Sequence, residues 1–480
     1  MSTVLASHGL HFRTAWLEAL SNKWDLLAPS WATRQRHLEE RGYKEAYQTD
    51  AFYQWAADFL ALQGVARLSP EAWSAYRKSG YAPWALAGGT AYPSPDEAHA
   101  HLQALTDAMQ KLFAQARSES PLDMATLMSV LRFGGGSTPS FRTEAVNGPI
   151  RSLPPTEVEA AFGALLAEIH AQLAAGASPI AIAAWAHHAV TQIRPFTDGN
   201  ARTAFLLTQY ILWRRGLPGL YLKSDQRLAY YMALKAADEG HLQPWTELVL
   251  LGLQQAVLYA LSWTPAQPLP YDAAVQSFTQ RLAQWRTRQD RERSQRIITS
   301  RYTVFDYMEE ALRSIARSLE EKLKPEEGRG ARALVAKAYP DSPYYHQFTE
   351  HIVEYARQHG YYFNRSLARG WFKLKFSLSA SKKYQLVFTL HHAGYEDATM
   401  VVGAFLHFLE PLKYQQKRER RRSGGRGKRK ALYYFAPLPF YAPPMAFSIE
   451  QDAPSLRTFL KAYAESLLGQ ALSEITHEIY

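Results

Sequence analysis

The residues of this chain best suited to chemistry lie in one short stretch, RPFTDGNAR, at positions 194–202. Apolar side chains recur at helical spacing before it, over 185–193, and again after it, over 205–211. This pattern predicts a helix, a tight loop and a second helix. The reactive groups would therefore gather where the second helix begins.

The start of that second helix is suited to binding phosphate. The first backbone N–H groups of a helix have no partner within it, and the helix dipole adds partial positive charge there. Gly199, Asn200 and Ala201 supply the backbone at this point. The Asp198 carboxylate can hold a divalent cation that bridges phosphate oxygens, and the planar guanidinium of Arg202 can bind one of those oxygens. The stretch therefore predicts a nucleotide site.

Residues 195–202 resemble the motif of the Fic (Fido) family, H-P-F-x-[DE]-G-N-[GK]-R, with Ala201 as one departure. The resemblance implies that ATP and Mg²⁺ bind here, with Asp198 as the metal ligand and residues 199–202 on the nucleotide. It also implies transfer of AMP to a hydroxyl of a target protein. The first motif position differs, because Arg194 stands where the family has the histidine that deprotonates that hydroxyl.

Upstream, residues 140–148 read as a short hairpin turned by an Asn-Gly pair. The Fic family carries a similar hairpin, the flap, which receives an extended segment of the target by strand addition. The resemblance assigns target binding to Phe141, Thr143 and Val146. An ordinary surface hairpin is the alternative. After it, Thr156 and a glutamate three residues later predict a capping box at a helix start.

Arg194 decides what chemistry the motif can perform. A general base must exchange a proton near the working pH and typically contributes about 10²- to 10⁴-fold in rate. Arginine stays protonated and cannot do this. His187 lies two helical turns earlier, roughly 10 Å along the axis, and His188 points in another direction. The sequence therefore predicts a phosphate site that lacks its proton acceptor.

Three hypotheses follow. In the first, the protein binds a nucleotide but its AMP-transfer activity is lost or strongly reduced. In the second, the same architecture performs altered chemistry in which stabilisation of phosphate charge matters more than a base. In the third, the natural protein carries histidine at position 194 and is an active AMP-transferase. The intact residues 198–202 favour phosphate binding in all three.

Other candidate residues lie outside the motif. Phe205 stands where the family often has a second phosphate-binding arginine. The resemblance places Tyr230 or Tyr231 near the nucleotide base, with helix packing as the alternative. The adjacent pairs His187–His188 and His391–His392 are interpreted as structural, because neighbouring residues do not share a face of a helix or strand.

The length of 480 residues and the changes of composition indicate several domains. We predict an N-terminal region of short helices (1–110), a mainly helical Fic core with a β-hairpin flap (111–262), a Pro-rich linker with a helical arm (263–330) and an α+β domain (331–480). In the last of these, apolar and polar residues alternate over 372–378, which predicts a strand, and 384–390, 400–409 and 433–440 are interpreted as further strands. Aromatic residues at helical spacing, such as Phe52, Trp55 and Phe59, are interpreted as core.

The positive charge is concentrated in one segment. Residues 413–430 hold ten Lys or Arg and one Glu, 10 − 1 = +9 of the formal net charge of +10. Such a segment predicts binding of nucleic acid or another polyanion, and a flexible tip that binds nothing is the alternative. The chain has no cysteine, which excludes thiolate chemistry. Without a leader or a membrane span, we expect a cytoplasmic protein that does not contact membranes, and the sequence gives no oligomeric state.

Overall fold

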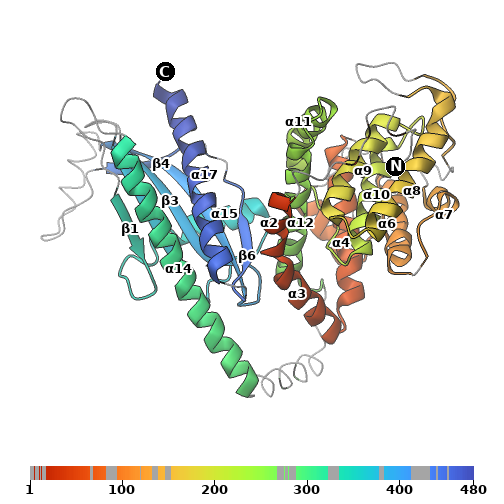
Figure 1. The fold of residues 1–480 in the computed structure, drawn as a ribbon. Coiled ribbons are helices and arrows are strands. Elements are labelled where there is room, and N and C mark those ends of the chain that lie inside the picture. Colours follow the sequence, from red (N-terminus) through yellow and green to blue (C-terminus); the bar gives the residue numbers. More distant parts are fainter. Residues whose placement is uncertain are drawn as a thin grey trace, which may run out of the picture. The chain divides into compact units, whose positions relative to one another are not determined.

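The computed structural model forms two compact units, Met1–Leu269 and Pro270–Tyr480, drawn in Figure 1. The residues it describes are 18–64, 69–82, 94–118, 120–131, 139–145, 153–266, 288–322, 334–377, 383–411, 433–438, 440, 442–450 and 453–479, with Leu5, Leu10, Phe12, Val275 and Thr279.

The first unit is helical. Its helices are α2 (Glu18–Asp25), α3 (Ala28–Glu40), α4 (Lys44–Leu62), α5 (Pro70–Lys78), α6 (Pro95–Arg117), α7 (Met124–Val130), α8 (Val158–Ala174), α9 (Pro179–Ile193), α10 (Asn200–Arg214), α11 (Arg227–Asp238) and α12 (Gln243–Ser262). The predicted helical core is confirmed. The expectation of only short helices before residue 115 is wrong for α4 and α6, because neither contains a glycine or a proline beyond its first turn.

Helix α10 is the central helix of this unit. All its residues from Thr203 to Trp213 are buried, and it packs against α9 and α6. Phe205 stacks on Phe59 of α4, with 4.1 Å between the ring centroids. A helix that is buried on every side is held by its neighbours along its whole length. The loop that enters α10 at Asn200 therefore has a fixed support.

The predicted capping box before α8 is wrong. Residues Pro155–Glu157 form a turn of 3₁₀-helix, and α8 begins only at Val158. The Glu157 backbone N–H donates to the Pro154 carbonyl over 3.0 Å, so the paired prolines start the tight turn. Thr156 lies inside this turn and cannot cap the helix.

The second unit is an α+β domain, as predicted. Its strands are β1 (Leu334–Ala338), β2 (Gly370–Ser377), β3 (Lys383–His392), β4 (Thr399–Pro411), β5 (Tyr433–Pro437) and β6 (Met445–Ser448). They form an antiparallel sheet in the order β1-β2-β3-β4-β5, with β6 also paired to β4. The sequence prediction missed β1 and β6.

Helices cover both faces of this sheet. Helix α14 (Arg288–Lys322) packs against α17 (Ala453–Ile479), and its Phe305 lies over Gly370. Helix α15 (Thr349–His359) places Tyr355 over Gly403. Gly370 pairs with Leu390 of β3, and Gly403 pairs with Thr389. Neighbouring residues of a strand point to opposite faces of the sheet, so the two glycines lie on opposite faces. Helices α14 and α15 therefore lie on opposite faces (Figure 1). In the described ranges no helix has the length and hydropathy to cross a membrane.

Candidate functional site

Two residues with left-handed backbone conformation shape the motif loop. Helix α9 ends at Ile193, and Arg194 follows with φ 47° and ψ 66°. Gly199, at φ 78°, leads into α10. The proline after Arg194 disfavours a further helical residue before it, and a left-handed conformation costs a non-glycine residue about 1–2 kcal/mol. The surrounding contacts must therefore hold Arg194 in place.

The side chain of Asn200 closes the loop. Its Oδ1 accepts a hydrogen bond from the Phe196 backbone N–H over 2.8 Å, and its Nδ2 donates to the Phe196 carbonyl over 2.7 Å. Thr203 donates from its backbone N–H (2.9 Å) and its hydroxyl (3.1 Å) to the Gly199 carbonyl. The Asn200 side chain thus shapes the loop, and its backbone N–H is the group that it offers to an anion.

Asp198 and Arg202 lie side by side at the entrance to α10. Arg202 Nη2 donates to Asp198 Oδ2 over 2.7 Å, one helical turn apart. The side chain of Asp198 is 83% exposed, whereas that of Arg202 is 16% exposed. Burial lowers the pKa of Arg202, and the Asp198 carboxylate opposes this effect. Asp198 is therefore open to a cation from solvent, and Arg202 is held near the backbone N–H groups. Ala201, between them in sequence, is half-buried.

These residues suit a cation that arrives with a phosphate. No group of three or more His, Asp or Glu side chains within the described ranges could enclose a metal ion. Mg²⁺ commonly takes one or two protein carboxylates and completes its shell with waters and substrate phosphates. A single exposed carboxylate beside a helix N-terminus matches that donor set.

Arg142, which the sequence did not single out, joins the flap segment to the motif loop. Its backbone N–H donates to the Pro195 carbonyl over 3.0 Å. Its buried guanidinium donates to the carbonyls of Arg194 (2.8 Å), Ile193 (3.3 Å) and Glu144 (3.0 Å), and also to that of Leu153. The Arg142–Arg194 contact spans 52 positions in the chain. One side chain therefore fixes the C-terminal end of α9 and both described sides of the predicted flap.

The flap residues named from the sequence fall in different places. Phe141 forms an antiparallel bridge with Phe196, and their rings stack at 5.6 Å. Phe162 of α8 meets both rings edge to face. Thr143 is exposed next to this bridge, and Val146 lies outside the described residues. Phe141 thus anchors the predicted flap segment to the motif loop, whereas Thr143 is exposed to solvent.

The two histidines near Arg194 are hydrogen-bonded to other residues. His187 is fully buried, with Nδ1 3.0 Å from the Thr208 hydroxyl and Nε2 3.0 Å from the Tyr230 hydroxyl. Burial lowers the pKa of His187 to about 3. His188 Nε2 lies 2.8 Å from Asp238 Oδ1. Neither ring is available to replace the missing base.

Tyr230 and Phe205, which lie near the motif, are both packed inside the protein. Tyr230 is buried and bonded to His187, whereas Tyr231 is 43% exposed. Phe205 is fully buried against Phe59, so nothing at that position reaches a phosphate.

The second histidine pair is structural too. His391 and His392 are buried on β3, bonded to Tyr361 and Arg301. The basic segment 413–430 lies outside the described residues.

A family model described as Fic/DOC family matches residues 127–212, which include the flap anchor, α8, α9 and the motif loop. This region of the chain is therefore similar to the Fic/DOC family. The departure at Arg194 therefore occurs within a Fic/DOC motif, and the remaining motif residues can be compared with relatives.

Individual relatives match a smaller region. Over 71 residues the chain is 41% identical to "Protein adenylyltransferase Fic" of Drosophila melanogaster, which covers 15% of this chain and 14% of that protein. Over 94 residues it is 36% identical to the protein of the same name from Nematostella vectensis, covering 20% and 22%. The chain thus spans only about one seventh to one fifth of these curated relatives.

Solved structures resemble about half of the chain, with low TM-scores. A Fic domain containing signaling protein from Bacteroides thetaiotaomicron covers 50% of this chain and 97% of its own, at 18% identity and a TM-score of 0.38. Fic-1 from C. elegans covers 52% and 73%, at 21% identity and a TM-score of 0.36. The similarity to the Fic/DOC family depends on the sequence match and not on these scores.

Replacement of Arg142 by lysine should destabilise the first unit. Lysine keeps the positive charge but cannot serve four carbonyls at once, so buried acceptors lose their donors. We expect the free energy of unfolding to fall by about 3 kcal/mol, measured by chemical denaturation. The exposed Arg357→Lys variant is the control and should change it by less than about 0.5 kcal/mol. Equal stability of the two variants would contradict this role of Arg142.

The His187 hydrogen bonds predict a pH dependence. The folded protein keeps His187 neutral down to about pH 3, whereas an unfolded chain takes up this proton near pH 6.5. The stability that neutral His187 contributes is full above about pH 6.5 and falls toward pH 3, by about 1.4 kcal/mol per pH unit. As the pH is lowered through this window, the difference in free energy of unfolding between the wild type and His187→Gln should shrink. The surface variant His241→Gln is the control. A constant difference would refute the buried neutral state.

Proposed function

We propose that this Fic/DOC-like protein binds a nucleotide, ATP with Mg²⁺, at residues 198–202 and that its AMP-transfer activity is lost or strongly reduced. One observation carries the proposal. The phosphate-binding groups stand together at the start of α10, while Arg194 occupies the position of the base and both nearby histidines are bonded to other residues.

Local charge supports an anion at this loop. Burial lowers the pKa of Arg142, and the charge of Arg194 lowers it further, so the two guanidinium groups repel one another. The N-terminus of α10 adds partial positive charge, and Arg202 lies one turn inside it. A polyphosphate would offset this excess charge, which the single Asp198 carboxylate balances only in part.

Different residues of the loop would bind different parts of the ligand. The backbone N–H groups at the start of α10 hold phosphate oxygens, and Arg202 exchanges its bond with Asp198 for a bond to phosphate. Asp198 is then free to hold Mg²⁺, which when bound neutralises phosphate charge. Asn200 and Gly199 keep the loop in shape throughout.

Arg194 limits the reaction at proton removal. Transfer of AMP to a hydroxyl requires an acceptor for the hydroxyl proton, and a guanidinium stays protonated in proteins. Its charge can still attract a phosphate. Arg194 would therefore permit binding of the nucleotide but not transfer of AMP. The target would be an extended protein segment laid beside Thr143 by strand addition.

Binding of Mg²⁺–ATP should raise the melting temperature of the full chain. At a ligand concentration 100 times the dissociation constant, the stabilisation is about 2.7 kcal/mol. Chelation of Mg²⁺ or the Asp198→Ala variant should remove most of this shift, and Arg202→Gln should weaken it. The control is Glu247→Ala, an exposed acid on α12. No shift with wild type, or an undiminished shift with Asp198→Ala, would refute the proposed site.

A further inference from the structure

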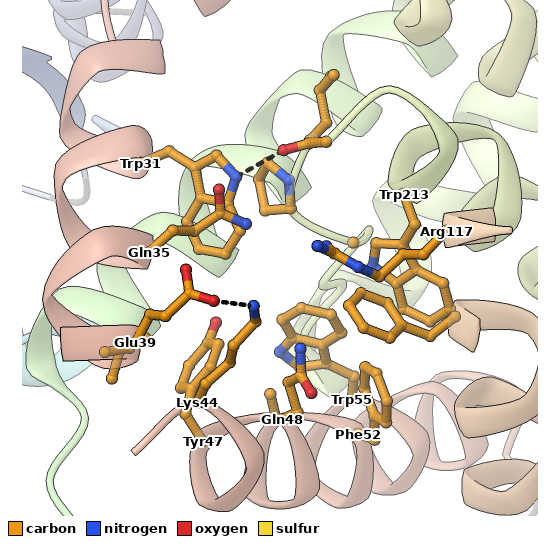
Figure 2. Close-up of a pocket in the computed structure, with 17 residues that line it drawn as sticks. Trp31, Gln35, Glu39, Lys44, Tyr47, Gln48, Phe52, Trp55, Arg117 and Trp213 are labelled. Carbon is orange, nitrogen blue, oxygen red and sulfur yellow. Dashed lines mark hydrogen bonds and ion pairs between the residues drawn. The ribbon is translucent and has the colours of Figure 1, made fainter. Parts of the chain in front are cut away.

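A second site lies at the other end of α10. A pocket of about 120 Å³ opens between α3, α4, α6 and the chain that follows α10 (Figure 2). Trp213 lies thirteen residues after Asn200, which is about 20 Å along the helix. The pocket is therefore separate from the motif loop.

Six aromatic residues line the pocket. They are Trp31, Tyr47, Phe52, Trp55, Phe113 and Trp213. Gly219 allows two of the indoles to lie close to its backbone, because a Cβ there would lie 2.4 Å from Trp55 and 3.0 Å from the Trp213 indole nitrogen. The Trp31 indole donates to the Gly216 carbonyl over 2.9 Å and holds the chain above the pocket (Figure 2). This wall suits a flat aromatic ring.

Two buried donors of this wall have no partner. Within the described ranges, neither the Trp55 Nε1–H nor the Tyr47 hydroxyl finds a hydrogen-bond acceptor, and both side chains are at least nine-tenths buried. A buried donor without an acceptor is destabilising, so a ligand that supplies the acceptor gains by it. Figure 2 shows Lys44 and Gln48 beside these rings, and their long side chains can move aside for a ligand oxygen.

The charged groups of the pocket favour an anion. Lys44 pairs with Glu39 over 2.8 Å, so the one carboxylate in the wall is already neutralised. Arg117 points its guanidinium into the space (Figure 2) and lies over the Phe113 ring at 5.6 Å. In the described part of the chain no carboxylate forms an ion pair with Arg117. The charges of Lys44 and Arg117 both lower the pKa of Glu39, so two cations face the single carboxylate of the wall. A ligand carboxylate would offset the excess positive charge and could reach the two unmet donors.

Size limits the ligand to one ring. An apolar protein cavity of about 150 Å³ holds benzene, and this pocket is slightly smaller. We propose that the pocket binds a small aromatic carboxylate, with its ring among the indoles and its carboxylate between Arg117 and the two unmet donors. Nothing in the motif loop takes part in this binding.

Calorimetric titration of the full chain with sodium benzoate tests the proposal. We expect binding with a dissociation constant of about 1 mM or tighter. Benzylamine, which has the same ring and the opposite charge, should bind at least about tenfold more weakly. No heat of binding with benzoate, or equal binding of benzylamine, would overturn the proposal.

Variants then locate the ligand. Arg117→Gln and Trp55→Phe should each weaken benzoate binding by about tenfold, while Lys111→Gln, an exposed residue of the same helix that does not line the pocket, should not. Arg117 is exposed, so its replacement should leave the melting temperature unchanged and serves as the decisive variant. Wild-type affinity in Arg117→Gln would place benzoate elsewhere and overturn the proposal.

Discussion

The bonds from the Arg142 guanidinium to the last carbonyls of α9 are the interaction on which the motif loop depends. They hold Arg194 in a left-handed conformation that its side chain disfavours, and they join the flap segment to the same point. The loop can then turn back into α10 within six residues. Burial of α10 on every side fixes the other end. The groups that we propose to bind phosphate are consequently positioned before any ligand arrives.

This arrangement separates the motif residues that shape the loop from those that face solvent. Asn200 and Gly199 are required by the fold itself, so their presence would be expected even in a protein that no longer binds a nucleotide. Asp198 is different, because its carboxylate is 83% exposed and contributes little to packing. Asp198 and Arg202 are therefore the motif residues that indicate nucleotide binding most directly.

The sequence predicted the elements that have a strong period or a distinctive motif. Helical spacing predicted α9 and α10. Alternation predicted β2, and the apolar segments after it predicted β3 to β5. Arg142 escaped prediction because its partners are backbone carbonyls distant in sequence, which leave no pattern of residue types. Short strands such as β1 and β6 carry too little alternation to be recognised. Trp55 was correctly placed in the core, but only packing shows that its N–H lacks an acceptor beside a pocket.

Arg194 replaces the proton acceptor that transfer of AMP would need, and labelled AMP transfer to a lysate tests this most directly. Wild type and Arg194→His should be compared at equal protein concentration from about pH 5 to pH 8. We predict no labelled band with wild type, and labelling by the variant that increases with pH as the imidazole loses its proton, by about 10²-fold or more over wild type. Labelling by wild type at a similar rate, or none by a variant that still binds Mg²⁺–ATP, would contradict the account.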